Sequence, residues 1–480
     1  MGSHMNKKLD YLFRLKGEPK FQKLDTKMMP FQIFKKISKE FDNNFIFESL
    51  DGPKELVESS IIGFDPKYII KCNLRSLQIL NKDNEIQKMS IKGPLEIIRK
   101  YFPIVKEQQY RYVGGLVGFF CYEAIRFWEK IPIKRELKFP LCEFGWYEDG
   151  LVYDHKKSKL EYFYYDESRI EKIRSIIEIP RSSQNLNKPT YSNLKRNVSK
   201  KMYEEKVNII KKHLQNGDVF QTVLSKKITF KYVGDSLLLY EELRRINPSP
   251  YMFYFKNGSQ VLLGASPEML LRITGSYVET YPIAGSRPVS NDQKITNNFK
   301  KEMKSDKKEV AEHTMLVDLA RNDLGKVCKF GTVSTPELMK VKRFSHIQHM
   351  VSHVVGILDN RYDIFDAFKA VFPAGTISGA PKIRAMEIIN NLESESRGPY
   401  AGAIGYFSFN QCCDFAITIR SAFISDQKGF TQSGAGIVID SIPSKEFQET
   451  EDKSKAILIA LQGLDPSISN NTIRQKRKVK

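Results

Sequence analysis

Short runs of β-branched and aromatic residues, separated by turn residues, recur along almost the whole chain, and no other feature constrains its fold as strongly. Between residues 6 and 178 they include NNFIFESL, YIIKCNL and LEYFYYDES, with only a few helical stretches among them. Beyond residue 200 they alternate with amphipathic segments such as KKMYEEKVNIIKKHLQNGD, which predicts a helix that stops at Asn216 and Gly217. The pattern predicts an α+β protein whose first part is mainly sheet.

The composition changes between residues 180 and 200, where PRSSQNLNKPTYSNLKRNVSK loses its apolar periodicity and gains Asn, Ser and Pro. Such a change is typical of a linker or surface loop. We therefore expect an N-terminal region at 6–190 and a second domain at 198–465. Residues 1–5 have the form of a cloning remnant and are left out of fold reasoning. The basic end at 466–480 is expected to be frayed.

Charge, hydropathy and cysteine usage limit the class of protein. The 480-residue chain has a formal net charge of +20, but its lysines are spread through most segments, which is more typical of solvation than of nucleic-acid binding. A basic nucleic-acid-binding protein stays open as an alternative. The longest apolar stretch, GGLVGFFCYEAI, is roughly half as long as a membrane span, so we expect no membrane partner. Six cysteines without CxxC spacing indicate reduced thiols and a cytoplasmic protein.

Two Glu-x-x-Glu pairs lie on predicted helix faces: Glu309 with Glu312, and Glu446 with Glu449, the second pair followed by Lys453. Solvated surface pairs, worth only about 0.2–0.5 kcal/mol each, are one interpretation. However, the first pair starts a stripe that continues with leucines and should face the core. Two carboxylates about 4 Å apart repel by on the order of 4 kcal/mol at an effective dielectric near 20, so four that converge would need a cation. Mg²⁺, which prefers oxygen ligands and an anionic substrate, is the natural candidate.

Two glycine-bearing loops could hold an anion. In FPAGTISGAPKIRAMEII, Gly375 and Thr376 lie at the front of a predicted helix, where free N–H groups favour negative charge. In SGAGIVIDS, Gly434 and Gly436 precede a strand and would let the backbone approach a ligand closely. The segment FAITIRSAF predicts an alternating strand that carries Arg420, either as a surface residue or as a carboxylate clamp. Taken alone, such a loop is more often an ordinary helix cap or turn, and a mid-strand arginine is most often a surface residue.

Three histidines, His346, His349 and His353, share a face if FSHIQHMVSHVVG is helical, which would permit a zinc site. No HExxH motif accompanies them, and the neighbouring residues are β-branched. A strand that places His349 and His353 on the face opposite to His346 is therefore the favoured prediction.

Six ordered motifs closely resemble those of the chorismate-utilising enzymes, specifically anthranilate synthase component I. They are PIAGSRP, EHTMLVDLARNDLG, FSHIQHMVSHVVG, AGTISGAPKIRAMEII, RGPYAGAIGYFSF and GAGIVIDSIPSKEFQETEDKSKA. The resemblance runs from about Lys200 to Leu464, with weaker similarity in FIFESLDG and GGLVGFFCYEAIR. It implies a large layered α/β/β/α sandwich, with antiparallel sheets flanked by helices. It also implies a regulatory role for 6–190 and a chorismate-binding catalytic domain at 198–465.

The resemblance implies a lyase that converts chorismate and ammonia into anthranilate and pyruvate, in tryptophan biosynthesis. Mg²⁺ would lie among Glu309, Glu312, Glu446 and Glu449, with Glu312 and Glu449 as its direct ligands. The implied catalytic residues are Glu268 as general acid for the departing ring hydroxyl, His349 in the elimination of pyruvate, Gln221 and Thr376. The implied substrate-binding residues are Ser286, Tyr400, Arg420, Gly434, Ala435, Gly436 and Lys453, with Tyr400 and Arg420 on the enolpyruvyl carboxylate.

The resemblance also implies a pocket that binds tryptophan, and tryptophan bound there would inhibit the enzyme. The residues of this pocket would be Glu48, Ser49, Pro250, Tyr251, Met252, Phe253, Ile404 and Tyr406. An indole ring favours a flat apolar slot, which Pro250, Met252 and Phe253 would supply, and the ammonium group of the amino acid favours a carboxylate, for which Glu48 is the expected partner. A strand end packed on a proline-rich turn is the alternative.

Two positions discriminate among relatives of this family. Those that add water carry a lysine base where this chain has Gln221, and ammonia needs no such base. Aminodeoxychorismate synthases usually carry a nucleophilic lysine where this chain has Ala284 in PIAGS, so aminodeoxychorismate synthase component I is the second interpretation. The usual RPRG is replaced by RPVS, which changes the residues at Val289 and Ser290. Because no glutaminase signature is found, we expect a glutamine amidotransferase partner, anthranilate synthase component II.

Overall fold

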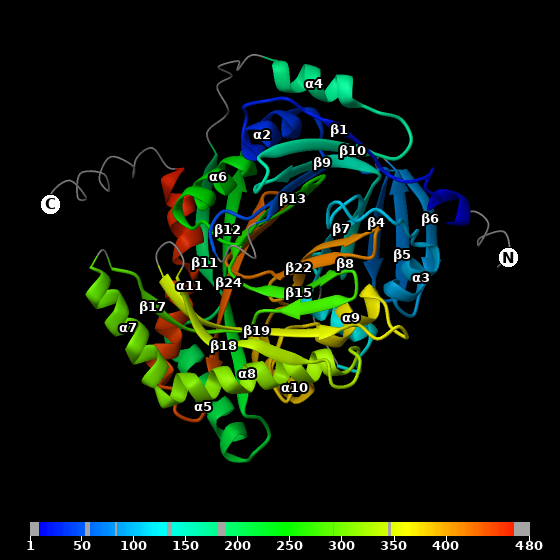
Figure 1. The fold of residues 1–480 in the computed structure, drawn as a ribbon. Helices are drawn as coiled ribbons and strands as arrows, with labels where there is room; N and C mark the ends of the chain where they lie inside the picture. Colours follow the sequence, from blue (N-terminus) through cyan, green and yellow to red (C-terminus); the bar gives the residue numbers. More distant parts are fainter. Residues whose placement is uncertain are drawn as a thin grey trace.

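The computed structural model describes residues 9–52, 58–81, 84–131, 137–179, 189–290, 292–343 and 347–464, without the side chains of Ser286 and Ile347 (Figure 1). Its secondary structure is arranged as two large antiparallel sheets with helices outside them, as the resemblance implies. The predicted α+β class is confirmed. Among the described residues, no helix is long and apolar enough to cross a membrane.

The first sheet contains strands from both ends of the chain. Its order is β1 (Lys20–Lys23), β10 (Lys159–Tyr164), β9 (Asp149–Asp154), β3 (Ser59–Phe64), β2 (Asn44–Glu48), β13 (Tyr251–Asn257), β14 (Gln260–Ser266), β23 (Ser421–Ser425), β24 (Lys428–Ile437), β12 (Gln221–Val233) and β11 (Thr190–Arg196), with β20 (Gly379–Ala380) paired to β12. Helices α2 (Pro30–Glu40), α4 (Ile170–Glu178), α5 (Lys200–Gln215), α6 (Ser236–Ile246), α10 (Lys382–Leu392) and α11 (Pro443–Gly463) supply residues to its outer face.

The second sheet has the order β17 (Ile283–Pro288), β19 (Ile347–Ile357), β16 (Tyr277–Thr280), β15 (Met269–Thr274), β22 (Cys413–Ile417), β21 (Ala403–Ser408), β7 (Gly115–Phe120), β8 (Cys142–Tyr147), β4 (Tyr68–Asn73), β5 (Ser76–Asn81) and β6 (Asn84–Ser90), with β18 (Ser334–Arg343) paired to β19. Helices α3 (Pro94–Tyr101), α7 (Gln293–Ser305), α8 (Lys307–Gly325) and α9 (Ile364–Val371), with the 3₁₀ turns η1 (Tyr122–Phe127) and η2 (Gly375–Ile377), complete the described elements.

Strand alternation places the main core between the two sheets. Successive side chains of a strand point to opposite faces, so Phe253 and Phe255 of β13 enter the core between the sheets, while Met252 and Tyr254 pack toward the helices. The two regions expected at 6–190 and 198–465 share both sheets, because β2 pairs with β13 and β7 pairs with β21. The division between them stays a functional prediction.

Several local predictions are confirmed. Helix α5 ends at Gln215, and Gly217 follows with φ +78°, a conformation that glycine adopts without steric cost. The histidine-rich segment contains the strand β19, whereas His346 lies outside the described residues. All six cysteines are buried and free, as their spacing predicts.

Two local predictions are wrong. Residues 190–196 belong to a strand, β11, rather than to a linker; β11 is an exposed edge strand, so it lacks the apolar alternation that would reveal it. The segment FAITIRSAF is not one strand: β22 ends at Ile417 and β23 starts at Ser421. Arg420 lies in the turn between them with φ +52°, because the chain there passes from the second sheet to the first.

Candidate active site

Glu268 lies where the chain crosses from β14 in the first sheet to β15 in the second. Its side chain is buried, and the N–H of Ile417 donates to its backbone oxygen at 3.1 Å. Burial raises the pKa of Glu268 to about 7, against the opposing effects of Thr376, Lys453 and Arg420. A carboxyl group with this pKa can hold a proton near neutral pH and release it in a reaction, as a general acid must.

Two positive charges, Lys453 and Arg420, act on this carboxyl group, and Tyr400 acts on Arg420. Lys453 on α11 donates to the backbone oxygen of Gly434 at 2.9 Å and pairs with Glu449 at 2.6 Å. A Cβ added at Gly434 would stand 3.0 Å from the hydroxyl oxygen of Tyr400, so these two predicted substrate residues are in contact. Burial lowers the pKa of Arg420, while Tyr400, Glu449 and Glu268 act to raise it. The arrangement can hold an anionic ligand.

His349 lies on β19, and its position in the register is opposite Ser286 of β17, whose side chain is outside the described residues. Its Nδ1 is 2.9 Å from the backbone oxygen of Gly285. A carbonyl oxygen only accepts, so Nδ1 carries the proton and donates it. Burial lowers the pKa of His349 to about 4, with further contributions from Arg420 and Lys453. The imidazole is therefore neutral at physiological pH, with an unprotonated Nε2.

Two buried polar atoms at the site have no hydrogen-bond partner in the described part of the chain: Oε1 of Gln221 and Oγ1 of Thr376. Gln221 begins β12, where it pairs with Ala380, and a Cβ added at Gly436 would stand 2.3 Å from its Nε2. Thr376 lies in η2, near enough to Glu268 to lower its pKa. Unsatisfied buried polar atoms are rare in native proteins and mark places where a ligand can bind.

The four glutamates of the expected metal site act on one another electrostatically. Burial, together with the charges of Glu446, Glu449 and Glu309, raises the pKa of Glu312 to about 7, against the opposing charge of Lys308. The pKa of Glu446 is also raised, first by burial and then by Glu449, against Ser441 and two lysines. Glu309 accepts from Arg287 at 2.6 Å, and its Oε2 is buried without a partner among the described residues.

These carboxylates fit a divalent cation in charge and donor type, because they repel one another and offer an unsatisfied oxygen. They are not drawn together, however: the described residues contain no group of three or more His, Cys, Asp and Glu side chains already placed around one ion. Mg²⁺ therefore stays a prediction. That His349 and His353 do not bind zinc also stays a prediction. His353 instead contacts Glu279, with Nε2 2.8 Å from Oε2.

A separate pocket lies between the sheets, and all eight residues predicted for tryptophan line it. Glu48 is not a free partner for an ammonium group, because its carboxylate accepts from Tyr240 at 2.8 Å and from Arg244 at 2.7 Å. Two further carboxylates, Glu58 and Asp414, also line the pocket. The expected ammonium partner Glu48 therefore belongs to a pocket wall in which the carboxylates of Glu48, Glu58 and Asp414 all have partners within the protein.

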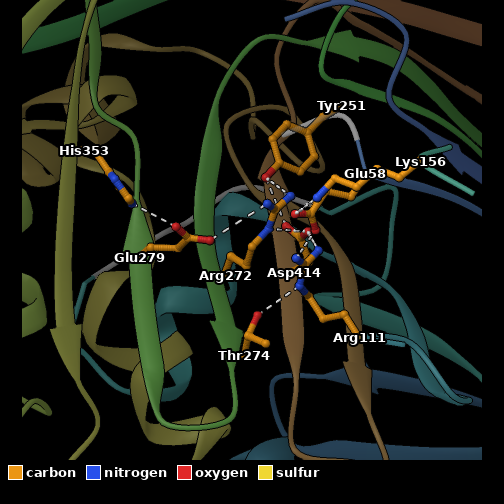
Figure 2. Close-up of polar contacts among 9 residues, drawn as sticks. All are labelled: Glu58, Arg111, Lys156, Tyr251, Arg272, Thr274, Glu279, His353 and Asp414. Atoms are coloured by element: carbon orange, nitrogen blue, oxygen red, sulfur yellow. Dashed lines mark hydrogen bonds and ion pairs between the residues drawn. The ribbon is translucent and has the colours of Figure 1, made fainter. Parts of the chain in front are cut away.

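That wall is an ion network that motif comparison missed (Figure 2). Arg272 donates to Asp414 at 2.8 Å and lies 3.9 Å from Glu279. Tyr251 donates to Asp414 at 3.1 Å, and Arg111 pairs with Glu58. These residues come from strands and loops far apart in the sequence, so no local spacing could have revealed them.

Another missed group is Arg397, which is almost fully buried. It donates to Glu393 at 2.9 Å and to the backbone oxygens of Ile377 and Val223, both at 2.7 Å. It thus ties η2 to β12 beside the site. Its sequence signals are its place at the start of the motif RGPYAGAIGYFSF, to which no role was assigned at this position, and its i, i+4 spacing from Glu393.

Comparison with known proteins identifies the family of this chain. The family model described as chorismate binding enzyme matches residues 42–459. The chain is 42% identical to anthranilate synthase component 1 of Methanothermobacter marburgensis over 93% of its length and 95% of the relative's, and 41% identical to that of Saccharolobus solfataricus over 90% and 97%. Membership of an enzyme family decides against a nucleic-acid-binding protein as the main interpretation.

Solved structures show the same fold. Anthranilate synthase component I from Streptococcus pneumoniae superposes with a TM-score of 0.75 at 34% identity, covering 84% of this chain and 92% of that one. The menaquinone-specific isochorismate synthase of Escherichia coli shares the fold, with a TM-score of 0.69 at 18% identity over 96% and 99% of the two chains. From the matched family model, these relatives and the architecture, we conclude that this chain is a chorismate-utilising enzyme, a lyase related to anthranilate synthase component 1.

Proposed function

We propose that this chain is the large subunit of a cytoplasmic anthranilate synthase, which converts chorismate and ammonia into anthranilate and pyruvate. The observation that carries the proposal is the buried carboxyl group of Glu268, with a pKa of about 7, next to Thr376 and within the field of Arg420 and Lys453. The reaction must expel a ring hydroxyl group, and hydroxide is a poor leaving group. Proton donation in the transition state contributes typically about 10²–10⁴-fold to such a step.

His349 is suited to the second stage, the loss of pyruvate. Its Nδ1 proton is engaged by Gly285, which fixes the ring and leaves Nε2 unprotonated. The pKa of about 4 means that the ring is neutral when substrate arrives and can take up a proton as the bond to pyruvate breaks. Gly285 has φ +64°, and a Cβ there would stand 2.7 Å from Oε2 of Glu309, so this backbone contact requires glycine.

Chorismate has two carboxylates, and each would be bound by a different group of residues. Arg420 and Tyr400 would hold the enolpyruvyl carboxylate, and the backbone at Gly434, Ala435 and Gly436 would approach the ring. Glu309, Glu312, Glu446 and Glu449 would hold Mg²⁺, which when bound supplies positive charge for the ring carboxylate. Without a cation, the ionised forms of these glutamates would repel an anionic substrate as well as one another, and their mutual repulsion contributes to the raised pKa values of Glu312 and Glu446.

Amination is favoured over the alternative reactions by two side chains. Gln221 is not a base, so it cannot activate water, but its unsatisfied Oε1 can accept a hydrogen bond from ammonia. Ala284 in β17 offers no nucleophile to the ring, which disfavours aminodeoxychorismate synthase component I.

The proposal includes regulation by tryptophan and a glutamine amidotransferase partner. The pocket between the sheets supplies the flat apolar surface of Pro250, Met252 and Phe253, together with charged groups for an amino acid. The amidotransferase, component II, would release ammonia from glutamine.

The nitrogen source tests the function. The purified chain, supplied with chorismate and Mg²⁺, should form anthranilate from ammonium salts, more readily at high pH, where free NH₃ is available. It should not use glutamine until component II is added. Glutamine-dependent anthranilate formation by the chain alone would refute this division of labour.

A further inference from the structure

One almost fully buried arginine, Arg397, donates to three separate segments of the chain. Its Nε and Nη2 hold the carboxylate of Glu393, which follows α10, at 2.9 and 2.8 Å. Its Nη1 donates to the backbone oxygen of Ile377 in η2, and its Nη2 to that of Val223 in β12, both at 2.7 Å. These contacts use four of the five N–H donors of a guanidinium group, so Arg397 holds chain segments together rather than binding a ligand.

The position of Arg397 is fixed from its other sides as well. Glu123 in η1 accepts from the backbone N–H groups of Arg397 and Gly398, at 2.6 and 2.9 Å. The guanidinium carbon lies 4.5 Å from the ring centroid of Tyr122 and 5.8 Å from that of Tyr400. A side chain that is locked in this way by packing and hydrogen bonds can in turn hold another group in place.

Glu393 completes a buried network with Arg397. Its Oε1 also accepts from the backbone N–H and the hydroxyl group of Ser225 in β12, at 2.8 and 2.7 Å. Gln432 in β24 donates to that hydroxyl group at 2.7 Å. Burial acts to lower the pKa of Arg397, but the charge of Glu393 keeps it above its ordinary value, so the guanidinium group stays charged. The network therefore joins β24, β12 and η2 through one ion pair.

The turn η2 is the place where this network meets the proposed chemistry. Thr376 directly precedes Ile377, the residue whose backbone oxygen accepts from Arg397. Because η2 has only three residues, a contact at Ile377 also restricts Thr376. Thr376 and Glu268 line the same cavity. Arg397 therefore acts on the surroundings of Glu268 without touching it.

Of the groups that act most strongly on Glu268, only Thr376 lies in a segment that Arg397 holds directly. Burial raises the pKa of Glu268, and four neighbours act to lower it: Thr376, Lys453, the backbone of Ile283, and Arg420. The effect of Thr376 is the largest of these four. Release of η2 would therefore weaken the main influence that opposes burial and would leave the other three in place.

We propose that Arg397 is a positioning residue for the reaction, which holds Thr376 beside Glu268 through the backbone of η2. The proposal rests on the proposed function, because the position of Thr376 matters only if Glu268 donates a proton. Arginine suits this position, since its planar fork reaches a carboxylate and two backbone oxygens together, whereas the ammonium group of lysine is a compact point charge. Arg397 itself takes no part in the proton transfers.

The test compares Arg397→Lys with Arg169→Lys in the full-length chain. Lysine at residue 397 keeps the charge but cannot hold all three segments, so kcat should fall by about 10–10²-fold, while the KM for chorismate should change little. At a fixed concentration of free NH₃, the decline of kcat with rising pH should begin about one pH unit higher, because Thr376 then no longer opposes burial at Glu268. A folded Arg397→Lys enzyme with the pH profile of the wild type would overturn the positioning role.

Arg169→Lys is the matched control for a merely structural effect. Arg169 forms a similar fork with Asp149, at 2.8 and 2.6 Å, where α4 meets β9, and neither element carries a predicted active-site residue. The substitution should lower the melting temperature and leave kcat, KM and the pH profile near those of the wild type. A shift of the pH profile as large as that of Arg397→Lys would mean that loss of any such fork has this effect, and would overturn the proposal.

A double substitution tests whether Arg397 acts through Thr376. Thr376→Val removes the hydroxyl group, so it should move the pH profile upward by itself. Arg397→Lys in the Thr376→Val background should then move the profile no further, because the two changes remove the same interaction. Shifts that add would show that Arg397 acts by another path and would overturn the proposal.

A further variant keeps the test decisive if Arg397→Lys does not fold. Glu393→Gln keeps the shape but removes the charge that holds the fork, so the pH profile should move in the same direction. An unmoved profile in folded Glu393→Gln enzyme would overturn the proposal. Wild-type turnover with ammonium is measured first: if it is absent, the proposed function fails and this role with it, whereas normal turnover with unmoved profiles in the variants rejects the role of Arg397 alone.

Discussion

At the scale of single residues, burial sets the chemistry of the candidate site. Glu268 and Glu312 both have pKa values raised to about 7, while the pKa of His349 is lowered to about 4, and burial is the largest cause in each case. Desolvation disfavours the charged form of every group. It therefore keeps the carboxyl groups of Glu268 and Glu312 protonated up to a higher pH and keeps the imidazole of His349 neutral. The same low-dielectric surroundings supply both an acid and a base at neutral pH.

Glu268→Gln should lower kcat by about 10²–10⁴-fold, because glutamine keeps the shape but cannot donate the proton. In the wild type, kcat at a fixed concentration of free NH₃ should fall as pH rises above about 7, since the carboxyl group then loses its proton. Steady-state rates from pH 6 to 9 check both statements. A wild-type kcat that is independent of pH under these conditions would contradict the role of Glu268.

The same group makes a prediction about stability. Its folded-state pKa is raised, so the stability it contributes is full below the unfolded pKa, near 4.5, and is lost as pH rises through about 7. Glu268→Gln removes that loss, so the variant should gain stability relative to the wild type as pH increases from about 4.5 to 8. Thermal melts at several pH values measure the difference, and a gain confined to acidic pH would have the wrong sign.

Glu312→Gln should abolish turnover with little loss of fold, because it removes a proposed ligand and also relieves repulsion among the four glutamates. At pH 8, Mg²⁺ should raise the melting temperature of the wild type but not that of the variant. Glu171→Gln is a suitable control, because Glu171 lies on α4 and pairs with the exposed Arg174 rather than with any residue of the four-glutamate cluster. Full activity of the wild type in EDTA would rule out the magnesium site.

At the scale of helices and strands, a site residue can be predicted from the sequence when it lies within a regular helix or strand, and not when it lies in a turn or on an edge strand. The helix that starts at Lys307 and the strand β19 are both evident from local pattern, and so are Glu309, Glu312 and His349 on them. The turn at Arg420 and the edge strand β11 could not be predicted, because tertiary pairing overrides or replaces the local signal there. The ion network in Figure 2 joins distant strands and leaves no local trace.

Lys382→Met should destabilise the protein by about 3 kcal/mol, because it leaves Asp323 buried with only the more exposed Lys326 as partner. Urea unfolding measures the loss. Arg361→Met provides the comparison, since it breaks an exposed pair with Asp359 and should cost no more than about 1 kcal/mol. Equal effects of the two substitutions would mean that the α8–α10 pairing contributes little to stability.

At the scale of the whole molecule, the two sheets connect the pocket proposed for tryptophan with the candidate active site. Strand β15 starts directly after Glu268, and its residue Arg272 lines the pocket and pairs with Asp414. A ligand that binds the pocket better in one conformation than in the other can therefore bias the position of Glu268. The resemblance predicted the layered fold and named residues that line one pocket, whose binding of tryptophan stays a prediction, whereas the link through β15 depends on the sheet order.

Tryptophan should raise the apparent KM for chorismate, and a coupling free energy of 1–3 kcal/mol would correspond to roughly 5–150-fold. Ser49→Phe fills the slot, so it should remove inhibition and leave catalysis intact. Calorimetry tests binding directly, and an absence of tryptophan binding at millimolar concentration would end this hypothesis without affecting the catalytic one.

The product formed from chorismate tests the central claim most directly. The purified chain, incubated with chorismate, Mg²⁺ and ¹⁵N-labelled ammonium, should release pyruvate together with fluorescent anthranilate that carries the label, as identified by mass spectrometry. An aminated product that keeps its enolpyruvyl group would instead indicate aminodeoxychorismate synthase activity. Isochorismate, or no labelled product, would contradict the account.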